Sequence, residues 1–160
     1  MSLGQNPLGI IRFHGATTCH ALIDIRGSAM RNSAIHATGS KPPIPDFLLS
    51  LRKKVAILAS RPAEAFAQVL INEYQPGAGI GWHRDKPHFE DVAGVSLLAP
   101  CSFRLRRKNG TRWDRQTILV EPRSAYLMTG PSRTEWEHSI PPLAEHRYSI
   151  TLRTLRSQNS

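Results

Sequence analysis

Residues 66 to 152 of this chain break into short segments rich in β-branched and aromatic residues, with Pro and Gly between them. Segments of this kind are typical of β-strands, and no long helix fits between them. Six strands are predicted: Gln68 to Tyr74, Val92 to Leu98, Ser102 to Arg106, Thr117 to Val120, Ala125 to Met128 and Tyr148 to Leu152. The pattern favours a sandwich or barrel over a doubly wound sheet.

One helix is predicted before these strands. Lys41-Pro42-Pro43-Ile44-Pro45 is an extended connector, and Asp46 after it is a favourable N-cap. Between Phe47 and Ala59 apolar residues recur at helical spacing, namely Phe47, Leu51, Val55 and Leu58. The other side carries cations, which we interpret as a solvated helix face, with a phosphate-facing patch as the alternative: Arg52, Lys53 and Lys54.

The first 41 residues show little periodicity. They mix Gly, Ser, Thr and Asn with scattered Ile and Leu, and only Ala21 to Ile25 is predicted to form a strand. No aromatic residue occurs between Phe13 and Phe47. We therefore predict a poorly defined segment over 1–43, one folded domain over 44–156 and a tail over 157–160.

The charge balance points to a polyanionic partner. The chain has 21 Lys and Arg against 12 Asp and Glu, a formal net charge of +9. Such an excess favours nucleic acid, because cations release condensed counterions from phosphate. The alternative is a basic protein whose charge only keeps it soluble.

Other features of the sequence bound the class of protein. With 160 residues, 40% of them apolar, the chain can bury the core of one domain, and no run resembles a membrane span. Residues 1–22 lack the pattern of a secretory signal. Cys19 and Cys101 lack the paired spacing of a zinc site, and two cysteines are too few for a disulfide scaffold. We expect a cytoplasmic protein.

A His-x-Asp pair suggests a metal site. His83 and Asp85 lie two positions apart, so on an extended strand their side chains point the same way. His138, some fifty residues later, would complete two nitrogens and one oxygen, the ligand set of a facial triad on Fe(II). Three coordination positions then stay open for a bidentate 2-oxo acid and dioxygen. The alternative is a solvated surface strand.

The last predicted strand has a polar face and an apolar face. Tyr148, Ile150 and Leu152 alternate with four polar residues: Arg147, Ser149, Thr151 and Arg153. In a barrel the polar face would point inward, where buried guanidinium groups need an anion such as a dicarboxylate. The alternative is an exposed edge strand with its arginines in water.

Six motifs follow one another over about residues 44 to 155: Asn72-x-Tyr74, His83-x-Asp85, Val95-Ser96-Leu97, Phe103-x-x-Arg106, Gly130-x-x-Arg133-x-x-Trp136-x-His138-x-Ile140-Pro141 and Arg147-x5-Arg153. In their order and spacing they closely resemble the AlkB family of Fe(II)- and 2-oxoglutarate-dependent dioxygenases.

This resemblance implies a fold and a set of site residues. The fold is mainly β with flanking α, a double-stranded β-helix of the jelly-roll, cupin-like kind preceded by a helix. The iron ligands are His83, Asp85 and His138. Tyr74 and Arg147 take the distal carboxylate of 2-oxoglutarate, and Asn72 and Arg153 take the end that chelates iron. Ser149 replaces an asparagine of many members and can still donate one hydrogen bond.

The implied activity uses Fe(II), 2-oxoglutarate and O2 to demethylate N-alkylated bases in DNA or RNA, with release of succinate, CO2 and formaldehyde. Residues 44–156 would be the dioxygenase domain. The family's nucleotide-binding flap is usually rich in aromatic residues, so residues 1–43 would be a diverged or truncated flap. Nucleic acid is the expected partner, no membrane is expected, and a monomer is assumed.

Two departures leave the substrate open. Pro87 stands where several base-repairing members carry an acid that reads the damaged base. The expected substrate contacts are Trp82, Arg106, Arg133 and Trp136, with the basic cluster Arg104 to Lys108. Alternatively, Trp136 is a core aromatic and the cluster is an exposed hairpin end at Asn109-Gly110. The alternative functions are a 2-oxoglutarate oxygenase of protein or a small molecule and a non-catalytic basic nucleic-acid-binding protein.

Overall fold

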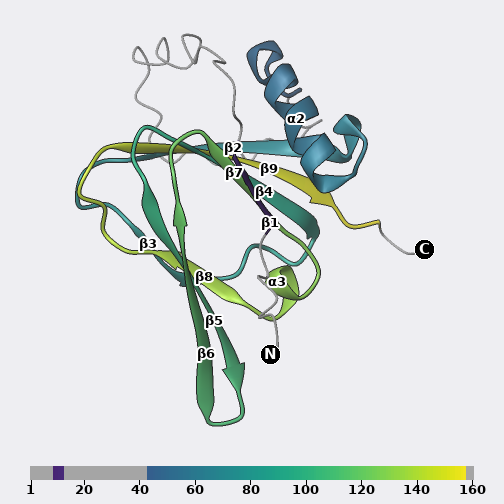
Figure 1. The fold of residues 1–160 in the computed structure, drawn as a ribbon. Coiled ribbons are helices and arrows are strands. Elements are labelled where there is room, and N and C mark those ends of the chain that lie inside the picture. The colour runs from purple at the N-terminus through teal and green to yellow at the C-terminus, as the bar shows by residue number, and fades with distance from the viewer. Residues whose placement is uncertain (1–8, 13–42, 158–160) are drawn as a thin grey trace, which may run out of the picture.

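The computed structural model describes residues 9–12 and 43–157, so the strand predicted at 21–25 lies outside it. Within these residues the strands form two sheets that face each other (Figure 1). The larger has the order β1-β7-β4-β9-β2 and the bounds Gly9–Arg12 (β1), Phe66–Tyr74 (β2), Phe89–Leu97 (β4), Ser124–Met128 (β7) and Arg147–Leu155 (β9). The smaller has the order β3-β8-β5-β6 and the bounds Ile80–His83 (β3), Cys101–Asn109 (β5), Arg112–Val120 (β6) and Glu137–Ile140 (β8).

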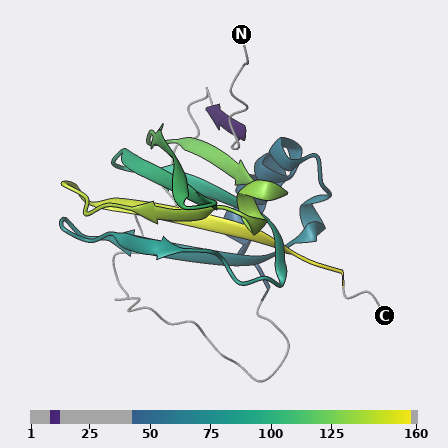
Figure 2. The same ribbon diagram turned by 90° about the horizontal axis from the view of Figure 1, so that it is seen from below.

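All the strand pairs described are antiparallel, and the chain passes repeatedly from one sheet to the other. This is the predicted double-stranded β-helix preceded by a helix. Figure 2, from the side of the smaller sheet, shows β2 and β9 running side by side in the larger one. The six predicted strands are all present and all begin earlier than predicted, and β5 and β9 also end later. Strands β1, β3 and β8 were not among the six. No helix in the described ranges is long and apolar enough to cross a membrane.

The helix differs from the prediction at its start. A 3₁₀ turn occupies Asp46–Leu48, and α2 follows as Leu49–Ala59. Asp46 makes no side-chain capping hydrogen bond, so the N-cap prediction was wrong. Phe47, predicted to be buried, is 45% exposed, and Leu48 is buried in its place. The 3₁₀ turn has about three residues per turn, which moves the apolar face by one position at this end.

Two apolar clusters hold the sheets and the helix together. The first lies between the sheets and includes Phe103, Met128 and Trp136. The second lies between α2 and the outside of the larger sheet, where Val55 and Leu48 contact residues such as Ile150 and Leu152. Helix α2 therefore covers the larger sheet from outside and leaves the space between the sheets to the inward side chains (Figure 1).

Strand β9 resolves the alternative that its polar face left open. It pairs with β2 on one side and β4 on the other, so it is a central strand and the exposed edge strand is excluded. Ile150 and Leu152 pack toward α2, and by alternation the polar residues point between the sheets. Arg147 is fully buried there.

Gly94→Ala is expected to destabilise the fold by about 1 to 3 kcal/mol, because overpacking forces side chains off their rotamers. Gly94 lies on β4 directly opposite Tyr126 on β7. A Cβ at Gly94 would collide with atoms of the Tyr126 ring, which lines the cavity described below. Urea unfolding measures the loss. Gly81→Ala is the control, because a Cβ there meets open space, and an equal loss in both variants would contradict the prediction.

Candidate metal centre and anion pocket

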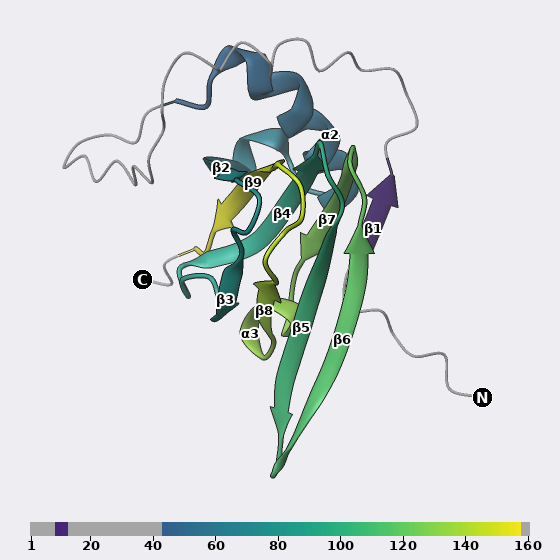
Figure 3. The same ribbon diagram turned by 90° about the vertical axis from the view of Figure 1, so that its left-hand side faces the viewer.

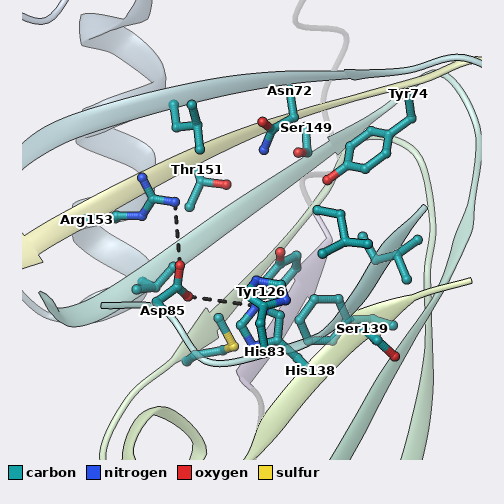
Figure 4. Close-up of a pocket in the computed structure, with 16 residues that line it drawn as sticks. Asn72, Tyr74, His83, Asp85, Tyr126, His138, Ser139, Ser149, Thr151 and Arg153 are labelled. Carbon is teal, nitrogen blue, oxygen red and sulfur yellow. Dashed lines mark ion pairs between the residues drawn. The ribbon is translucent and has the colours of Figure 1, made fainter. Parts of the chain in front are cut away.

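Strands β3 and β8 bring the three predicted metal ligands together. His83 is the last residue of β3 and pairs with His138 on β8, while Asp85 follows β3 in the next loop. One ligand atom from each residue lies within 4.8 Å of the other two. The two imidazole rings are 4.2 Å apart between centroids, and the Asp85 carboxylate is 3.8 Å from Nε2 of His138 (Figure 4).

Both histidines are prepared to offer a lone pair. His83 donates from Nδ1 to the carbonyl oxygen of Gly81 at 2.9 Å, so the neutral ring offers the lone pair of Nε2 to a metal. Burial, and then the nearby His83, lower the pKa of His138 to about 4, although Asp85 acts in the opposite direction. At neutral pH His138 is therefore uncharged, the form in which imidazole binds a cation.

Two arginines lie beside the Asp85 carboxylate. Arg153 Nη2 lies 3.5 Å from Oδ1 of Asp85, and Arg133 Nη1 lies 3.9 Å from Oδ2 (Figure 4 draws the Arg153 pair). Arg133 also donates to the carbonyl oxygen of Phe89 at 3.0 Å. Burial lowers the pKa of both guanidinium groups, and Asp85 counteracts it. The carboxylate therefore lies between two guanidinium groups and the imidazole of His138.

A cavity of about 150 Å³ adjoins the three ligands. Among its walls are four of the residues predicted to hold 2-oxoglutarate: Asn72, Tyr74, Ser149 and Arg153. Asn72 and Ser149 are directly opposite each other on β2 and β9, and so are Tyr74 and Arg147. The cross-strand register therefore explains why residues far apart in sequence share one wall.

Arg147 is the fifth predicted residue and lies behind the Tyr74 ring, with its guanidinium carbon 5.1 Å from the ring centre. Its Nε donates to Ser96 Oγ at 3.0 Å, but Nη1 and Nη2 have no hydrogen-bond partner among the described residues. A fully buried cation with two unsatisfied N–H-bearing nitrogens is costly unless an anion approaches. A carboxylate of a 2-oxo dicarboxylic acid fits this requirement.

The predicted substrate contacts do not lie together. Trp136 and Arg133 are buried, Trp136 in the core between the sheets and Arg133 against Asp85, so neither presents a surface to a nucleic acid. Trp82 and Arg106 are half-buried and contact each other, but neither lines the cavity. The basic cluster is on the hairpin of β5 and β6, which turns at Gly110 in the left-handed region, as the hairpin alternative predicted.

Sequence reasoning missed three parts of the site. Tyr126 lines the cavity, and burial raises the pKa of its phenol, so it stays protonated and can donate a hydrogen bond. Ser96 belongs to the Val95-Ser96-Leu97 motif, but its contact with Arg147 was not predicted. The contact of Arg133 with Asp85 joins residues 48 positions apart, and no local pattern signals it.

The chain matches a family model described as the 2OG-Fe(II) oxygenase superfamily over residues 13–156. It belongs to the 2OG-Fe(II) oxygenase superfamily. The matched range begins N-terminal to the predicted domain, 44–156. The cofactors that this family name states or implies, Fe(II), 2-oxoglutarate and O2, are those predicted from the motifs. The neutral His138, the adjacent Asp85 and the unpaired Arg147 fit the metal and the cosubstrate on structural grounds.

Curated relatives confirm the resemblance to the AlkB family. The alpha-ketoglutarate-dependent dioxygenase AlkB of Salmonella typhimurium is 32% identical over 126 residues, which are 70% of this chain and 56% of that protein. The alkylated DNA repair protein ALKBH8 homolog of Arabidopsis thaliana is 29% identical over 119 residues, 56% of this chain and 34% of that protein. This chain therefore spans about a third to just over half of these relatives.

A solved structure confirms the fold. The prolyl-4-hydroxylase of Pseudomonas putida superposes with a TM-score of 0.62 and 15% identity, over 98% of this chain and 91% of the other. At this identity the similarity concerns the double-stranded β-helix of the oxygenase superfamily alone.

The metal-free oxygenase is expected to lose stability as the pH falls from about 6.5 toward 4. The pKa of His138 is about 4 in the fold and about 6.5 in the unfolded chain, so protons favour the unfolded state across this range. The contribution, up to about 3 kcal/mol, is present above pH 6.5 and disappears below the folded pKa. Urea unfolding across this range should give a shallower slope for His138→Gln than for the wild type. His88→Gln, an exposed control, should keep the wild-type slope, and equal slopes for all three proteins would contradict this assignment.

Proposed function

We propose that this chain is an Fe(II)- and 2-oxoglutarate-dependent dioxygenase that oxidatively demethylates N-alkylated bases in DNA or RNA. The observation that carries the proposal is the cluster of His83, Asp85 and His138 beside a cavity lined by Tyr74. Behind the Tyr74 ring lies the buried Arg147, whose Nη1 and Nη2 have no hydrogen-bond partner among the described residues. The AlkB relatives and the net charge of +9 favour an alkylated nucleic acid over a protein or a small molecule. We expect the enzyme to act in the cytoplasm as a monomer.

Each part of the chain has a role in this proposal. His83, Asp85 and His138 hold the metal on one face, so that its other positions stay open. Arg147 with Tyr74, and Arg153 with Asn72, bind and orient the two ends of 2-oxoglutarate. The apolar residues of both sheets that line the cavity limit the access of water to it. Bound Fe(II) would supply the oxidation chemistry by which 2-oxoglutarate and O2 give succinate, CO2 and one oxygen atom inserted into an N-methyl C–H bond. The resulting hemiaminal releases formaldehyde and the unmodified base.

Pro87 gives the proposal a specific limit. It lies exposed in the loop after Asp85 and has neither an acidic side chain nor a backbone N–H to read a base edge. Selection by an acid at this position is therefore absent from the proposed mechanism. DNA and RNA substrates should be tested side by side.

The test incubates the purified protein with Fe(II), 2-oxoglutarate, ascorbate and a single strand that carries 1-methyladenine or 3-methylcytosine. Mass spectrometry of the oligonucleotide and a count of succinate in the same tube give the result. Loss of one methylene mass, dependent on 2-oxoglutarate and absent from His83→Ala, supports the proposal. Succinate without demethylation of any DNA or RNA substrate would reject the nucleic-acid part of the proposal. If protein that is shown to hold iron forms neither succinate nor demethylated oligonucleotide, the proposed enzyme activity is rejected.

A further inference from the structure

The side of the smaller sheet that faces away from the cavity carries an ordered stack of aromatic and guanidinium groups. The guanidinium carbon of Arg106 lies 4.4 Å from the ring centre of Trp82 and 4.4 Å from that of Trp113. Arg104 lies 5.2 Å from the Trp82 ring on the same side. Three strands thus contribute to one stack, since Trp82 is on β3, the arginines are on β5 and Trp113 is on β6.

The strand register shows what surrounds this stack. Cross-strand pairing sets Arg106 opposite Arg115 and Lys108 opposite Trp113. Alternation along the strands places the following residues on one surface, which we call the outer stacking face: Trp82, Arg104, Arg106, Lys108, Trp113, Arg115 and Glu137. It holds four cations and one carboxylate.

The charges on this face are not balanced by acids. Glu137 pairs with Arg106 at 2.7 Å, and Arg104 donates to Ser139, but the exposed Lys108 and Arg115 have no ion pair with any described residue. Arg115 also lies directly opposite another arginine, a like-charge pair that destabilises a sheet. The stack alone would stiffen the hairpin without needing these two further cations.

The opposite side of the same hairpin is neutralised, which makes the contrast informative. There Arg107 pairs with Asp114 at 3.1 Å and with Glu135 at 2.9 Å, and its guanidinium lies over the Trp136 ring. One hairpin therefore has a charge-balanced inner side and an outer side with unpaired cations beside tryptophans. Unpaired cations interleaved with aromatic rings are the combination that binds the phosphates and bases of single strands.

We propose that the outer stacking face binds single-stranded nucleic acid, as a second surface that holds a stretch of strand away from the target base. The proposal rests on the proposed function for the identity of the polymer. Phosphates would lie along Lys108, Arg115 and Arg104, and an unpaired base would extend the stack at Trp113. A duplex keeps its bases stacked inside and offers no such face, so a single strand is the occupant that this chemistry selects.

The outer stacking face is continuous with the metal centre through two strands. Trp82 immediately precedes His83 on β3, and Glu137 of this face immediately precedes His138 on β8. The face and the metal site are thus the two sides of the same strands. Figure 3 shows the hairpin of β5 and β6 extending past α3 (Pro131–Thr134) and β8. The hairpin part of the outer stacking face therefore projects beyond the strand that carries His138.

The test measures binding of labelled, unmodified strands of about 12 nucleotides by fluorescence anisotropy, which needs no catalysis. Single-stranded DNA, single-stranded RNA and a DNA duplex are titrated at several salt concentrations. Trp113→Ala should weaken single-strand binding about tenfold, and Trp113→Phe should weaken it less, since a smaller aromatic ring still stacks. Lys108→Gln with Arg115→Gln should lower the slope of log affinity against log salt by about 0.7 for each cation removed. Lys53→Gln, an exposed cation on α2, is the control and should keep the wild-type affinity.

Several outcomes would overturn the proposal. These are wild-type affinity in Trp113→Ala, an unchanged salt slope in the charge variant, an equal loss in Lys53→Gln, or duplex binding as tight as single-strand binding. Failure of the wild type to bind any single strand would also overturn it. The demethylation assay on the wild type is read separately. Binding that depends on Trp113, without demethylation, would refute the proposed function and leave this surface standing.

Discussion

Asp85→Ala is expected to abolish iron-dependent turnover and to lower the affinity for Fe(II) by orders of magnitude. The substitution removes the only carboxylate that faces His83 and His138 among the clustered ligands. It also leaves Arg153 and Arg133, at 3.5 and 3.9 Å from that carboxylate, as two cations without their acid. They would then repel a divalent metal that the carboxylate had attracted. Equilibrium dialysis with Fe(II) and succinate formation measure the two losses.

Asp46→Ala is the matched control for this experiment, because Asp46 is exposed in the 3₁₀ turn before α2 and makes no side-chain cap. It should bind iron and form succinate like the wild type. Activity retained in Asp85→Ala would mean that the metal ligands are misassigned.

Arg147→Met is expected to raise the 2-oxoglutarate concentration needed for half-maximal succinate formation by about tenfold or more. A hydrogen bond to a charged group contributes about 1.5 to 3 kcal/mol, and Arg147 has two nitrogens to offer. Without ligand, the variant should be at least as stable as the wild type, because methionine removes a buried cation whose Nη groups are unpaired. Thermal unfolding with and without 2-oxoglutarate should therefore show a ligand-dependent shift in the wild type that the variant lacks.

The control here is Arg112→Met, at the exposed end of the hairpin. It removes the same charge and should keep both the cosubstrate requirement and the thermal shift. An unchanged requirement in Arg147→Met would place the anion elsewhere in the cavity.

Local periodicity predicted strands and helix segments that are long enough for apolar and polar residues to separate onto different faces. The alternation from Arg147 to Arg153 separated a polar and an apolar face of β9, because side chains on a strand alternate between its two sides. It left open whether the polar face pointed inward, which the pairing with β2 and β4 decides. It did not identify β8, since Glu137–Ile140 is too short to show a period. The start of the helix was wrong for a similar reason, as a 3₁₀ turn follows another period than the α-helix predicted there.

Some features of the candidate site could also be predicted from the sequence, and others could not. The positions of His83, Asp85 and His138 followed from motif spacing, and the structure brings them together, while their role as ligands stays a prediction. The partners of Arg133 and of Arg106 did not follow, because Asp85 lies 48 residues from Arg133 and Trp82 lies two strands from Arg106. The sequence gives the positions of the Lys and Arg residues, but only the sheet register shows which of them share a face with tryptophans.

The most direct test of the metal assignment is an anaerobic titration of the protein with Fe(II) and 2-oxoglutarate, followed by visible absorption. A 2-oxo acid that chelates protein-bound Fe(II) gives a charge-transfer band that neither component gives alone. The wild type should develop this band at a ratio of one iron to one protein, His83→Ala and Asp85→Ala should not, and Arg147→Met should need more 2-oxoglutarate to reach it. A full band in the His83 or Asp85 variants, or no band in folded wild-type protein that holds iron, would contradict the site described here.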